Sequence, residues 1–450
     1  MTFASASWDV LRAILLLALL NGCASYQSKP LASDQPLFTG PTLKELSQSP
    51  PREFLKPVTV DLSRPLNANA IATVAVIANP DLKAQRVRAK VKDAQAFNAG
   101  LLPDATLSIG EDFLLSGPDT LNNLTAALGF DLNSLRTHAV AVAQAKAEGR
   151  QIHLDLAWAE WQTSGQARLQ AVRILALQTQ LNVEGESRKA QQALLTRTER
   201  AVKAGDLAAD QLQSAQTASL DAENKYNTTE RALVAARFEL NRLLGLPPAS
   251  SLALEPTVVP EAPPDAQRLY NLALAHRYDL AGLREGYSAQ ESALRAAVMD
   301  QFPALNLTIN GNRDTTGNKT FGPAIDFTLP LWNRNRGGIA VEKTTREALR
   351  AEYDARIFQT RAEIAAAVDD IVVARQQRER LLVRFPVERE IATASAAAAR
   401  HGDISGAAAE ATQQIMRDTV TQLSQAEQEI AELTISLELL TGTPQEEWMQ

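Results

Sequence analysis

The sequence has little of what small disulfide-bonded or zinc-dependent folds require. Its 450 residues include one cysteine, and aromatic residues make up only 5% of the chain. One cysteine excludes an internal disulfide framework and any zinc site built from several cysteines. The formal net charge of -7 argues against a nucleic-acid partner, because such proteins normally carry a basic surface. No stretch approaches the roughly 20 apolar residues that a membrane-spanning helix requires.

The amino terminus has the pattern of a targeting segment. Arg12 is followed by an apolar run from Ala13 to Leu20, which is eight residues long (20 − 13 + 1). A run of this length is typical of a signal peptide and too short to cross a membrane. The four residues that end at Cys23, Leu-Asn-Gly-Cys, resemble the bacterial lipobox, whose cysteine becomes the lipidated first residue.

We therefore expect residues 1–22 to be a signal peptide and Cys23 to carry a lipid such as palmitate. The alternative is an ordinary cleaved signal peptide followed by an incidental cysteine. No aspartate follows Cys23 in the way that resembles an inner-membrane retention signal, so the outer membrane is the expected destination. Residues 23–66, rich in Ser, Pro and Gln, are expected to form an extended tether from the anchor.

An internal repeat is the most informative feature of the sequence. Three pairs of segments share one offset of 197 residues, since 402 − 205, 442 − 245 and 327 − 130 are equal. The pairs are Ala204-Gly205-Asp206-Leu207 with His401-Gly402-Asp403-Ile404, Leu243-Leu244-Gly245 with Leu440-Thr441-Gly442, and Ala127–Leu132 with Ala324–Leu329. Three matches in one register indicate a duplication. We expect a first repeat over 67–245, a linker over 246–263 and a second repeat over 264–445.

Each repeat has the same expected order of elements. A helical lead-in (69–100 and 264–300) precedes two segments with the alternating pattern of β-strands, and two long helices follow. The helices are expected over 135–203, 207–244, 338–400 and 404–440, with an interruption at Pro386. At 1.5 Å per residue, the first of them would be about 100 Å long. The alternating segments are Thr106–Gly110, Leu124–Leu132, Leu305–Asn310 and Ile325–Leu329, with turn-prone residues at 116–119 and 311–318 between the partners of each pair.

Four strands of this kind cannot close a barrel within one chain. One face of the strands is apolar, and an open sheet would leave unpaired backbone at its edges, which lipid does not tolerate. Membrane barrels begin at eight strands, where side chains fill the interior, so two chains would form a plug and three a twelve-stranded barrel with a bore. The alternative is a soluble four-stranded sheet with one face against a core. The residues expected to line the bore are Thr106, Ser108, Thr125, Asn306, Thr308 and Asp326.

Several local patterns resemble those of the TolC-like outer-membrane efflux protein family. They are Arg277-Tyr278-Asp279-Leu280, Phe302-Pro303-Ala304-Leu305 and the run Pro-Leu-Trp-Asn-Arg-Asn-Arg-Gly-Gly over 330–338, which is most similar to the heavy-metal efflux branch. With the duplicated plan, the resemblance covers about residues 67–445. It implies a mainly α-helical homotrimer with a transmembrane β part. In that architecture, a twelve-stranded β-barrel with four strands per chain continues into a long periplasmic α-helical barrel.

The resemblance also implies a passive function without cofactors. The chain would be the outer-membrane channel of a tripartite efflux pump, reaching from the outer-membrane lipid into the periplasm. An inner-membrane transporter would drive metal ions or small toxic compounds through it by way of a periplasmic adaptor protein. Two alternatives stay open: a channel for protein secretion, and a lipid-anchored periplasmic coiled-coil scaffold whose sheet is soluble.

The turns between the paired long helices are the candidate functional sites. We expect a glycine to end one helix in a left-handed conformation and an aspartate to cap the next. The resemblance places the docking of the adaptor at these turns, and solvated caps without a further role are the alternative. In a trimer, two aspartates per chain would form a ring of six carboxylates that attracts cations to the entrance. The candidate residues are Ala204, Gly205, Asp206 and Leu207, with His401, Gly402, Asp403 and Ile404, and the ring consists of Asp206 and Asp403.

No pattern in the sequence is typical of an enzyme or a metal site. The serine in the segment 402–406 is spaced wrongly for a nucleophile elbow. The four histidines do not lie near carboxylates at metal-ligand spacing. Trp158 and Trp161, three apart on a long helix, are expected to pack in the interior. Trp332, at the end of a strand, is expected in an interfacial aromatic girdle.

Overall fold

The computed structural model describes residues 26–31, 60–256 and 265–448. Cys23 and the expected signal peptide over 1–22 lie outside the described residues, as do residues 32–59 of the expected tether and 257–264 around the end of the expected linker. Residues 26–31 belong to a separate unit of the chain from residues 60–256 and 265–448. All the helices and strands described below belong to the latter, the second unit.

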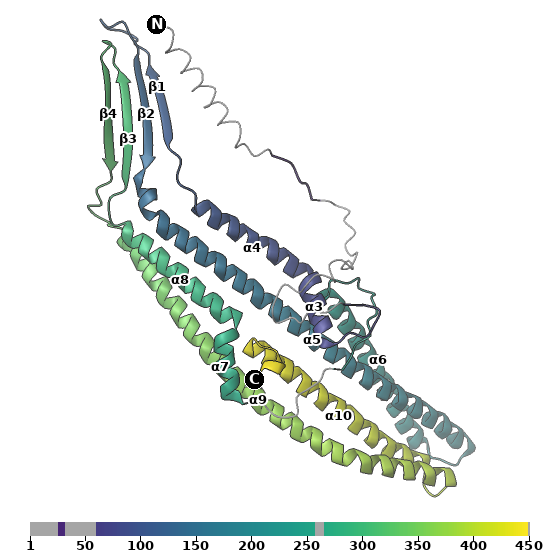
Figure 1. Cartoon of the computed structure of the whole chain (residues 1–450). Helices are drawn as coiled ribbons and strands as arrows, with labels where there is room; N and C mark the ends of the chain where they lie inside the picture. The colour runs from purple at the N-terminus through teal and green to yellow at the C-terminus, as the bar shows by residue number, and fades with distance from the viewer. Residues whose placement is uncertain (1–25, 32–59, 257–264, 449–450) are drawn as a thin grey trace. The chain divides into compact units, whose positions relative to one another are not determined.

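The second unit contains one order of elements twice: two helices, two strands, a long helix and a shorter helix (Figure 1). The first half consists of α3 (Ala68–Ala78), α4 (Pro80–Ala99), β1 (Thr106–Asp112), β2 (Asn123–Asp131), α5 (Leu132–Ala204) and α6 (Ala209–Leu243). The second half consists of α7 (Ala266–His276), α8 (Tyr278–Met299), β3 (Leu305–Arg313), β4 (Lys319–Phe327), α9 (Arg336–His401) and α10 (Gly406–Thr441), followed by the short helix η1 (Gln445–Glu447).

Each lead-in is two helices, so the prediction of a single helix was wrong. In the first half, Pro80 occupies the first turn of α4, and the side chain of Asn79 accepts a hydrogen bond from the N–H of Leu82 at 3.0 Å. Proline lacks an N–H and fits the first turn of a helix, so a new helix begins there. In the second half, the break falls at Arg277, whose extended backbone (φ -66, ψ 119) separates α7 from α8.

The two longest helices are uninterrupted. α5 runs for 73 residues, which corresponds to about 110 Å. α9 runs for 66 residues and continues through Pro386, so the predicted interruption was wrong. Pro386 is exposed, whereas Leu381 and Glu388 on either side of it are buried. Because α9 packs against α10 along this stretch, the tertiary contacts outweigh the one hydrogen bond that proline removes.

The four strands form one antiparallel sheet in the order β1-β2-β3-β4, which leaves β1 and β4 as its edges (Figure 1). The pairing of β2 with β3 joins the two halves of the chain. Each predicted strand region contains a strand, and every strand differs from its prediction in at least one limit. β1 extends to Asp112, β2 lies one residue earlier, and β3 extends to Arg313, so the turn begins at Asp314. β4 covers Lys319–Phe327 instead of Ile325–Leu329. Backbone pairing with the neighbouring strand decides these limits, and a single strand's pattern does not contain that information.

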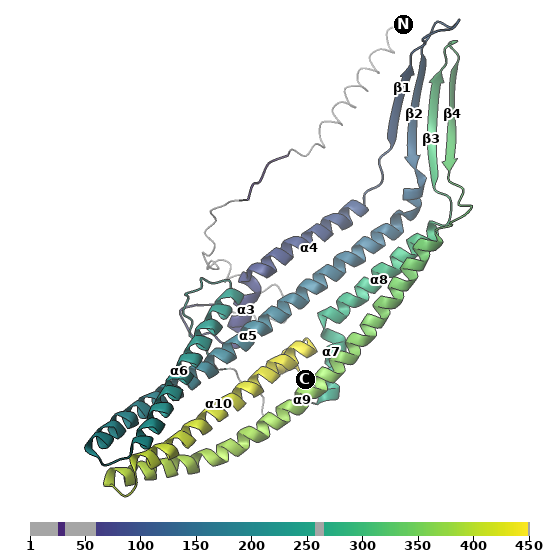
Figure 2. The same ribbon diagram turned by 180° about the vertical axis from the view of Figure 1, so that it is seen from behind.

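The helices form a layer with α5 at its centre. α5 packs against α4 and α8 in its first part and against α6 and α10 in its second, and α10 lies between α5 and α9 (Figures 1 and 2). Both hairpin turns, α5 to α6 and α9 to α10, lie at the end of this layer that is remote from the sheet. None of the helices in residues 60–256 and 265–448 combines the length and the apolar character needed to cross a membrane.

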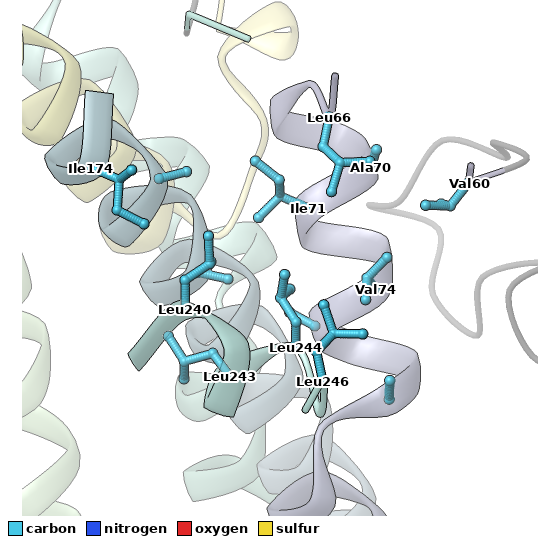
Figure 3. Packing of buried hydrophobic residues seen from close by; sticks show 14 of the residues in the cluster. Val60, Leu66, Ala70, Ile71, Val74, Ile174, Leu240, Leu243, Leu244 and Leu246 are labelled. Atoms are coloured by element: carbon cyan, nitrogen blue, oxygen red, sulfur yellow. The ribbon is translucent and has the colours of Figure 1, made fainter. Parts of the chain in front are cut away.

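Two hydrophobic cores hold the helices where the short and long helices meet. In the first, Ile71 and Val74 of α3 pack with Leu240 and with Leu244, just after α6 (Figure 3). Leu66 is buried in the same core, and its N–H donates to the carbonyl of Ala253 at 2.9 Å, so the last residue of the expected tether is held against the middle of the expected linker. The second core joins α7, α9 and α10 through Leu269, Ile364 and Leu437.

Candidate functional site at the hairpin turns and on the sheet

The turn of the first hairpin has the geometry that a glycine allows at the end of a helix. Gly205 has φ +81, in the left-handed region. Its N–H donates to the carbonyl of Val202 at 3.0 Å, and the N–H of Asp206 donates to the carbonyl of Ala201 at 2.9 Å. These two bonds form a Schellman motif, which satisfies the last carbonyls of α5. A Cβ on Gly205 would meet no atom within 4 Å, so the need for glycine comes from φ alone.

The second hairpin repeats this geometry. Gly402 has φ +85, its N–H donates to Ala399 at 3.3 Å, and the N–H of Asp403 donates to Ala398 at 3.0 Å. A Cβ on Gly402 would again meet nothing within 4 Å. The prediction that a glycine ends each helix is therefore confirmed in both halves.

The aspartates do not cap the helices that follow them, so that part of the prediction was wrong. The N-cap of α6 is Ala208, which has no side chain able to cap, and the N-cap of α10 is Ser405, whose Oγ accepts a bond from the N–H of Ala408 at 3.1 Å. Asp206 and Asp403 instead supply the backbone N–H that completes each Schellman motif. The helix starts two residues later than the aspartate pattern suggests, which leaves both aspartates among exposed residues.

Polar contacts join the two hairpins a few turns from their ends. The Oγ of Ser187 on α5 donates to the Oε1 of Gln414 on α10 at 2.7 Å. The amide of Gln191 donates to the Oε1 of Glu410 at 3.5 Å, and Arg417 forms a short ion pair with the same carboxylate. Both turns are thus held at the same end of the layer, although the eight candidate residues themselves stay exposed.

The two faces of the sheet differ completely in chemistry. The polar face carries the even-numbered residues of β1, β3 and β4 and the odd-numbered residues of β2, because the register pairs these positions across the strands. None of these side chains is larger than asparagine or aspartate, and none is basic. One cross-strand row contains Asp131, Asn306 and Asp326. The six residues expected to line a bore (Thr106, Ser108, Thr125, Asn306, Thr308, Asp326) all lie on this face, as predicted.

The opposite face is apolar over most of its height. Leu107, Leu128 and Ile309 form one row across three strands, and Phe321 on the edge strand is 82% exposed. Charged side chains occur on this face only in the row farthest from the helices, where Glu111, Arg313 and Lys319 lie. No described helix covers this face, so a large apolar surface is exposed in the single chain.

The end of β2 leads directly into the helical layer. Asp131 is the last residue of β2 and the N-cap of α5, and its carboxylate accepts a hydrogen bond from the N–H of Ser134 at 2.9 Å. The polar face of the sheet therefore ends where a 73-residue helix begins, with no loop between them.

The three singled-out tryptophans occupy different environments. Trp161 is buried and its Nε1 donates to the carbonyl of Leu439 at 3.4 Å, so the packing prediction is confirmed for it. Trp158 is partly buried and lies under the guanidinium of Arg277, 4.8 Å from its ring centre. Trp332 is 90% exposed at the strand-to-helix junction, and its place in a girdle stays a prediction.

Arg277 is the residue whose role sequence reasoning missed. Its guanidinium is buried and donates to both carboxylate oxygens of Asp279 at 2.9 and 2.7 Å. It also donates to the carbonyl of Leu440 at 3.3 Å, at the end of α10. The motif over 277–280 was recognised only as a family pattern, and the contact 163 residues away along the chain has no signal in one sequence.

The described residues contain no group of three or more His, Cys, Asp or Glu side chains placed to hold a metal ion. His153 on α5 forms a single contact of this kind, 2.8 Å from the carboxylate of Asp93 on α4. His153 and Asp93 form a surface ion pair when the imidazole is protonated. Two ligands are too few for a structural or catalytic metal site.

Comparison with known proteins agrees with the resemblance drawn from the motifs. The family model "Outer membrane efflux protein" matches residues 269–443, which lie in the second half. No curated protein matches the chain in sequence. The resemblance to TolC-like outer-membrane efflux proteins is therefore confirmed, by sequence in the second half and by fold in both.

The fold is similar to that of several solved outer-membrane proteins. The CmeC outer membrane channel of Campylobacter jejuni is 14% identical with a TM-score of 0.72, covering 93% of this chain and 94% of that one. VceC of Vibrio cholerae is 15% identical with a TM-score of 0.69, covering 84% and 96%. CusC is 16% identical with a TM-score of 0.66, covering 91% and 99%.

Proposed function

Starting from this resemblance to outer membrane efflux proteins, we propose that the chain forms a trimeric channel through the outer membrane. The observation that carries the proposal is the sheet: one face apolar and uncovered, the other small and polar, and both edges open. A sheet of this kind is stable in lipid only if it closes.

Three copies close the sheet without a change in strand direction. β1 and β4 run antiparallel, because four strands alternate direction in the order β1-β2-β3-β4. Pairing β4 of one copy with β1 of the next therefore continues the antiparallel pattern, and three copies give twelve strands (3 × 4). At about 3.4 Å per residue and a tilt of about 40°, a nine-residue strand spans about 23 Å, close to the apolar band of about 25 Å in outer-membrane barrels.

The helices then form a tunnel below the barrel, in the periplasm. α5 continues directly from β2, so the polar face of the sheet and the inner wall of a helical barrel would be one continuous duct. Efflux is passive in such a duct: an inner-membrane transporter supplies the driving force, and a periplasmic adaptor joins the two. Metal ions or small toxic compounds are the substrate classes that we propose, metals because of the motif over 330–338.

The hairpin turns are the proposed docking site for the adaptor. Ala204–Leu207 and His401–Ile404 are exposed at the end remote from the sheet, where a periplasmic partner would meet them. In a trimer, Asp206 and Asp403 would place six carboxylates around the entrance and attract cations. Their freedom from helix capping supports this role, because capping does not explain why both turns carry aspartate.

We also propose that the two halves arose by duplication and that Cys23 anchors the chain to the outer membrane. The offset of the repeat joins Gly205 to Gly402, and both adopt the same conformation in equivalent turns. Lipidation is tested by mass spectrometry of the amino-terminal peptide. A lipid adduct on Cys23 is expected, and an unmodified cysteine or a cleavage elsewhere would contradict it.

The function is tested by the mass of the chain in detergent and its single-channel conductance in a planar bilayer. We expect a mass of three copies and discrete conductance steps that favour cations. Replacing Asp206 and Asp403 by asparagine should reduce the cation preference and leave the trimer intact. A monomer or dimer without conductance would favour the periplasmic scaffold, whose sheet would be soluble without detergent.

Protein secretion is the second candidate within the channel class. It shares the duct, so the channel alone does not separate it from efflux. Deleting the gene should sensitise the cell to metal salts or toxic compounds if the chain serves efflux. Loss of a secreted protein from the medium, with unchanged sensitivity, would favour secretion.

A further inference from the structure

The two halves of the chain differ where the second strand of each half joins its long helix. In the first half, α5 begins at Leu132, immediately after β2. In the second half, residues 328–335 separate β4 from α9, and we call them the connector (Figure 1). With the repeat offset of 197, residues 329–335 correspond to residues 132–138, which form about the first two turns of α5. α9 is accordingly seven residues shorter than α5, because 73 − 66 equals 7. The second half thus replaces two helical turns by the connector.

The connector carries large apolar side chains that are exposed. Leu329, Leu331 and Trp332 are all exposed, with Trp332 at 90%. In the sequence, Leu329 and Leu331 continue the odd-numbered positions that form the apolar face of β4, and Phe327 at the end of that strand is exposed too. A surface that meets only water rarely gathers such side chains. The connector is therefore continuous with the face of the sheet that the proposed channel turns toward lipid.

A tight turn in the connector fixes the backbone beside the tryptophan. The N–H of Arg336 donates to the carbonyl of Asn333 at 3.0 Å, and the two residues between them, Arg334 and Asn335, have φ values of 47 and 51. Positive φ at both central residues is the pattern of a type I′ turn. The side chain of Asn335 donates to the carbonyl of Ala297 on α8 at 2.9 Å. The turn is thus held against the end of α8, and it carries one arginine at its tip and one at its end.

The two arginines of this turn are exposed and have no counterion. In the part of the chain that the structure describes, the guanidinium groups of Arg334 and Arg336 form no hydrogen bond or ion pair. The nearest acidic residues along the sequence are engaged elsewhere. Asp326 lies on the polar face of β4, and the carboxylate of Glu342 accepts a hydrogen bond from the amide of Gln290 on α8. The connector therefore presents two unpaired positive charges next to an exposed indole.

We propose that the connector anchors the chain to anionic phospholipids at the periplasmic boundary of the outer membrane; this inference rests on the proposed channel. In that channel, the sheet crosses the lipid and the helices stand in the periplasm, so the connector falls at the boundary. Trp332 lies at the level of the headgroups, where tryptophan is enriched. Arg334 and Arg336 bind the lipid phosphates, because a guanidinium pairs with phosphate oxygens and basic residues beside a bilayer attract anionic lipids.

Fluorescence quenching by brominated phospholipids tests the anchor. The full chain is reconstituted into phosphatidylcholine vesicles that contain a small fraction of phosphatidylglycerol, with bromine on the acyl chains of one lipid or of the other. The chain has five tryptophans, so the signal of Trp332 is taken as the difference between the parent chain and Trp332→Phe. We expect phosphatidylglycerol to quench Trp332 about fivefold more per lipid than phosphatidylcholine, which is the factor for one basic residue at an anionic lipid surface.

Removing the two charges should abolish the preference and keep the contact with lipid. In the variant with Arg334→Gln and Arg336→Gln, both lipids should quench Trp332 equally. The matched control, Arg313→Gln with Lys319→Gln, removes two positive charges from the opposite end of the same sheet face. It should keep the preference of the parent chain. Each variant should retain the detergent mass of three copies and the conductance of the parent, which shows that it is folded.

The other outcomes separate the anchor from the channel. Equal quenching by both lipids in the parent chain would overturn the anionic anchor, as would a control that loses the preference as fully as the arginine variant. A chain of three copies that conducts but shows no quenching of Trp332 would place the indole against a neighbouring copy. That result would overturn the anchor and leave the proposed channel standing. A parent chain that neither conducts nor forms three copies would overturn the channel and, with it, the anchor.

Discussion

In each half of the chain, a buried polar side chain between the two lead-in helices donates to a backbone carbonyl at the end of a hairpin, but the two residue types differ. In the first half, Asn79 is 2% exposed, and its side chain donates to the carbonyl of Leu243 at 3.0 Å. In the second half, Arg277 is 3% exposed and donates to the carbonyl of Leu440 at 3.3 Å. Leu243 and Leu440 are equivalent positions of the repeat, because 440 − 243 equals 402 − 205. Each side chain stands between the two lead-in helices and satisfies a carbonyl at the end of a hairpin.

The two side chains differ in charge and therefore in the partners that their burial requires. Asn79 is neutral and completes its bonding by capping α4. Arg277 brings a charge into the interior, and the carboxylate of Asp279, two residues away, balances it. A buried charge is tolerated only when it is paired and hydrogen-bonded. The motif over 277–280 is thus explained as one unit: a buried cation, its counterion and the start of α8.

The largest loss of stability is expected when the buried ion pair of Arg277 and Asp279 is broken. Arg277→Met removes the buried cation that pairs with Asp279 and the donor to the carbonyl of Leu440. Arg356 on α9 then remains near this carboxylate, at 4.0 Å. Removing one member of a buried pair typically costs about 3–5 kcal/mol. Thermal unfolding in detergent should show this loss, and the double variant with Asp279→Leu should recover part of it. Equal stability of both variants would mean that the pair does not act as a unit.

Removing the neutral side chain of Asn79 in the first half should lower the stability less. Asn79→Ala removes the bond to Leu243 and the cap on the N–H of Leu82, without leaving a charge unpaired. We expect a loss of about 2 kcal/mol, the sum of a buried hydrogen bond and a cap. The same unfolding measurement applies. A loss of stability as large as that for Arg277→Met would show that the buried charge does not make the second half more sensitive than the first.

The hairpin turns should respond equally in both halves. Gly205→Ala and Gly402→Ala each place a Cβ in the left-handed region, at about 1–2 kcal/mol, and neither new Cβ meets a neighbour within 4 Å. Unfolding measurements on the two single variants should therefore agree. Unequal losses would reveal that one turn carries a contact that the other lacks.

The smallest effect concerns the carboxylate of Asp155 in the first half, which lies near the charge of Asp279 in the second half. Burial, and then the charge of Asp279, raise the pKa of Asp155 on α5 above 3.8. The folded state therefore loses stability as the pH rises from 3.8 through that raised pKa, where Asp155 ionises more readily in the unfolded chain. Asp155→Asn should raise the melting temperature slightly at pH 7 and leave it unchanged below pH 3.8. A pH-independent difference would exclude ionisation as its cause.

The periodic parts of the fold were predictable because their signal is local. Alternation located part of each of the four strands, and the turn residues between the helices located the ends of the long helices to within a few residues, although Pro386 wrongly predicted a break in α9. The glycines of the two turns were also recognisable, since a left-handed residue favours glycine whatever surrounds it. The prediction that the aspartates cap the next helices was wrong, because the N-caps of α6 and α10 are Ala208 and Ser405. The sequence pattern is compatible with a helix that starts at the aspartate and with one that starts two residues later.

The sequence by itself determined the order of elements, the two-sided sheet and the places where the chain reverses, because each depends on neighbours within a few residues. The tertiary structure decided the rest. Contacts with α10 carry α9 through Pro386, and pairing with β2 extends β3 to Arg313. The interior position of Arg277 depends on a carbonyl 163 residues away. Such contacts are set by how the helices and strands pack, and a residue's neighbours along the chain do not encode them.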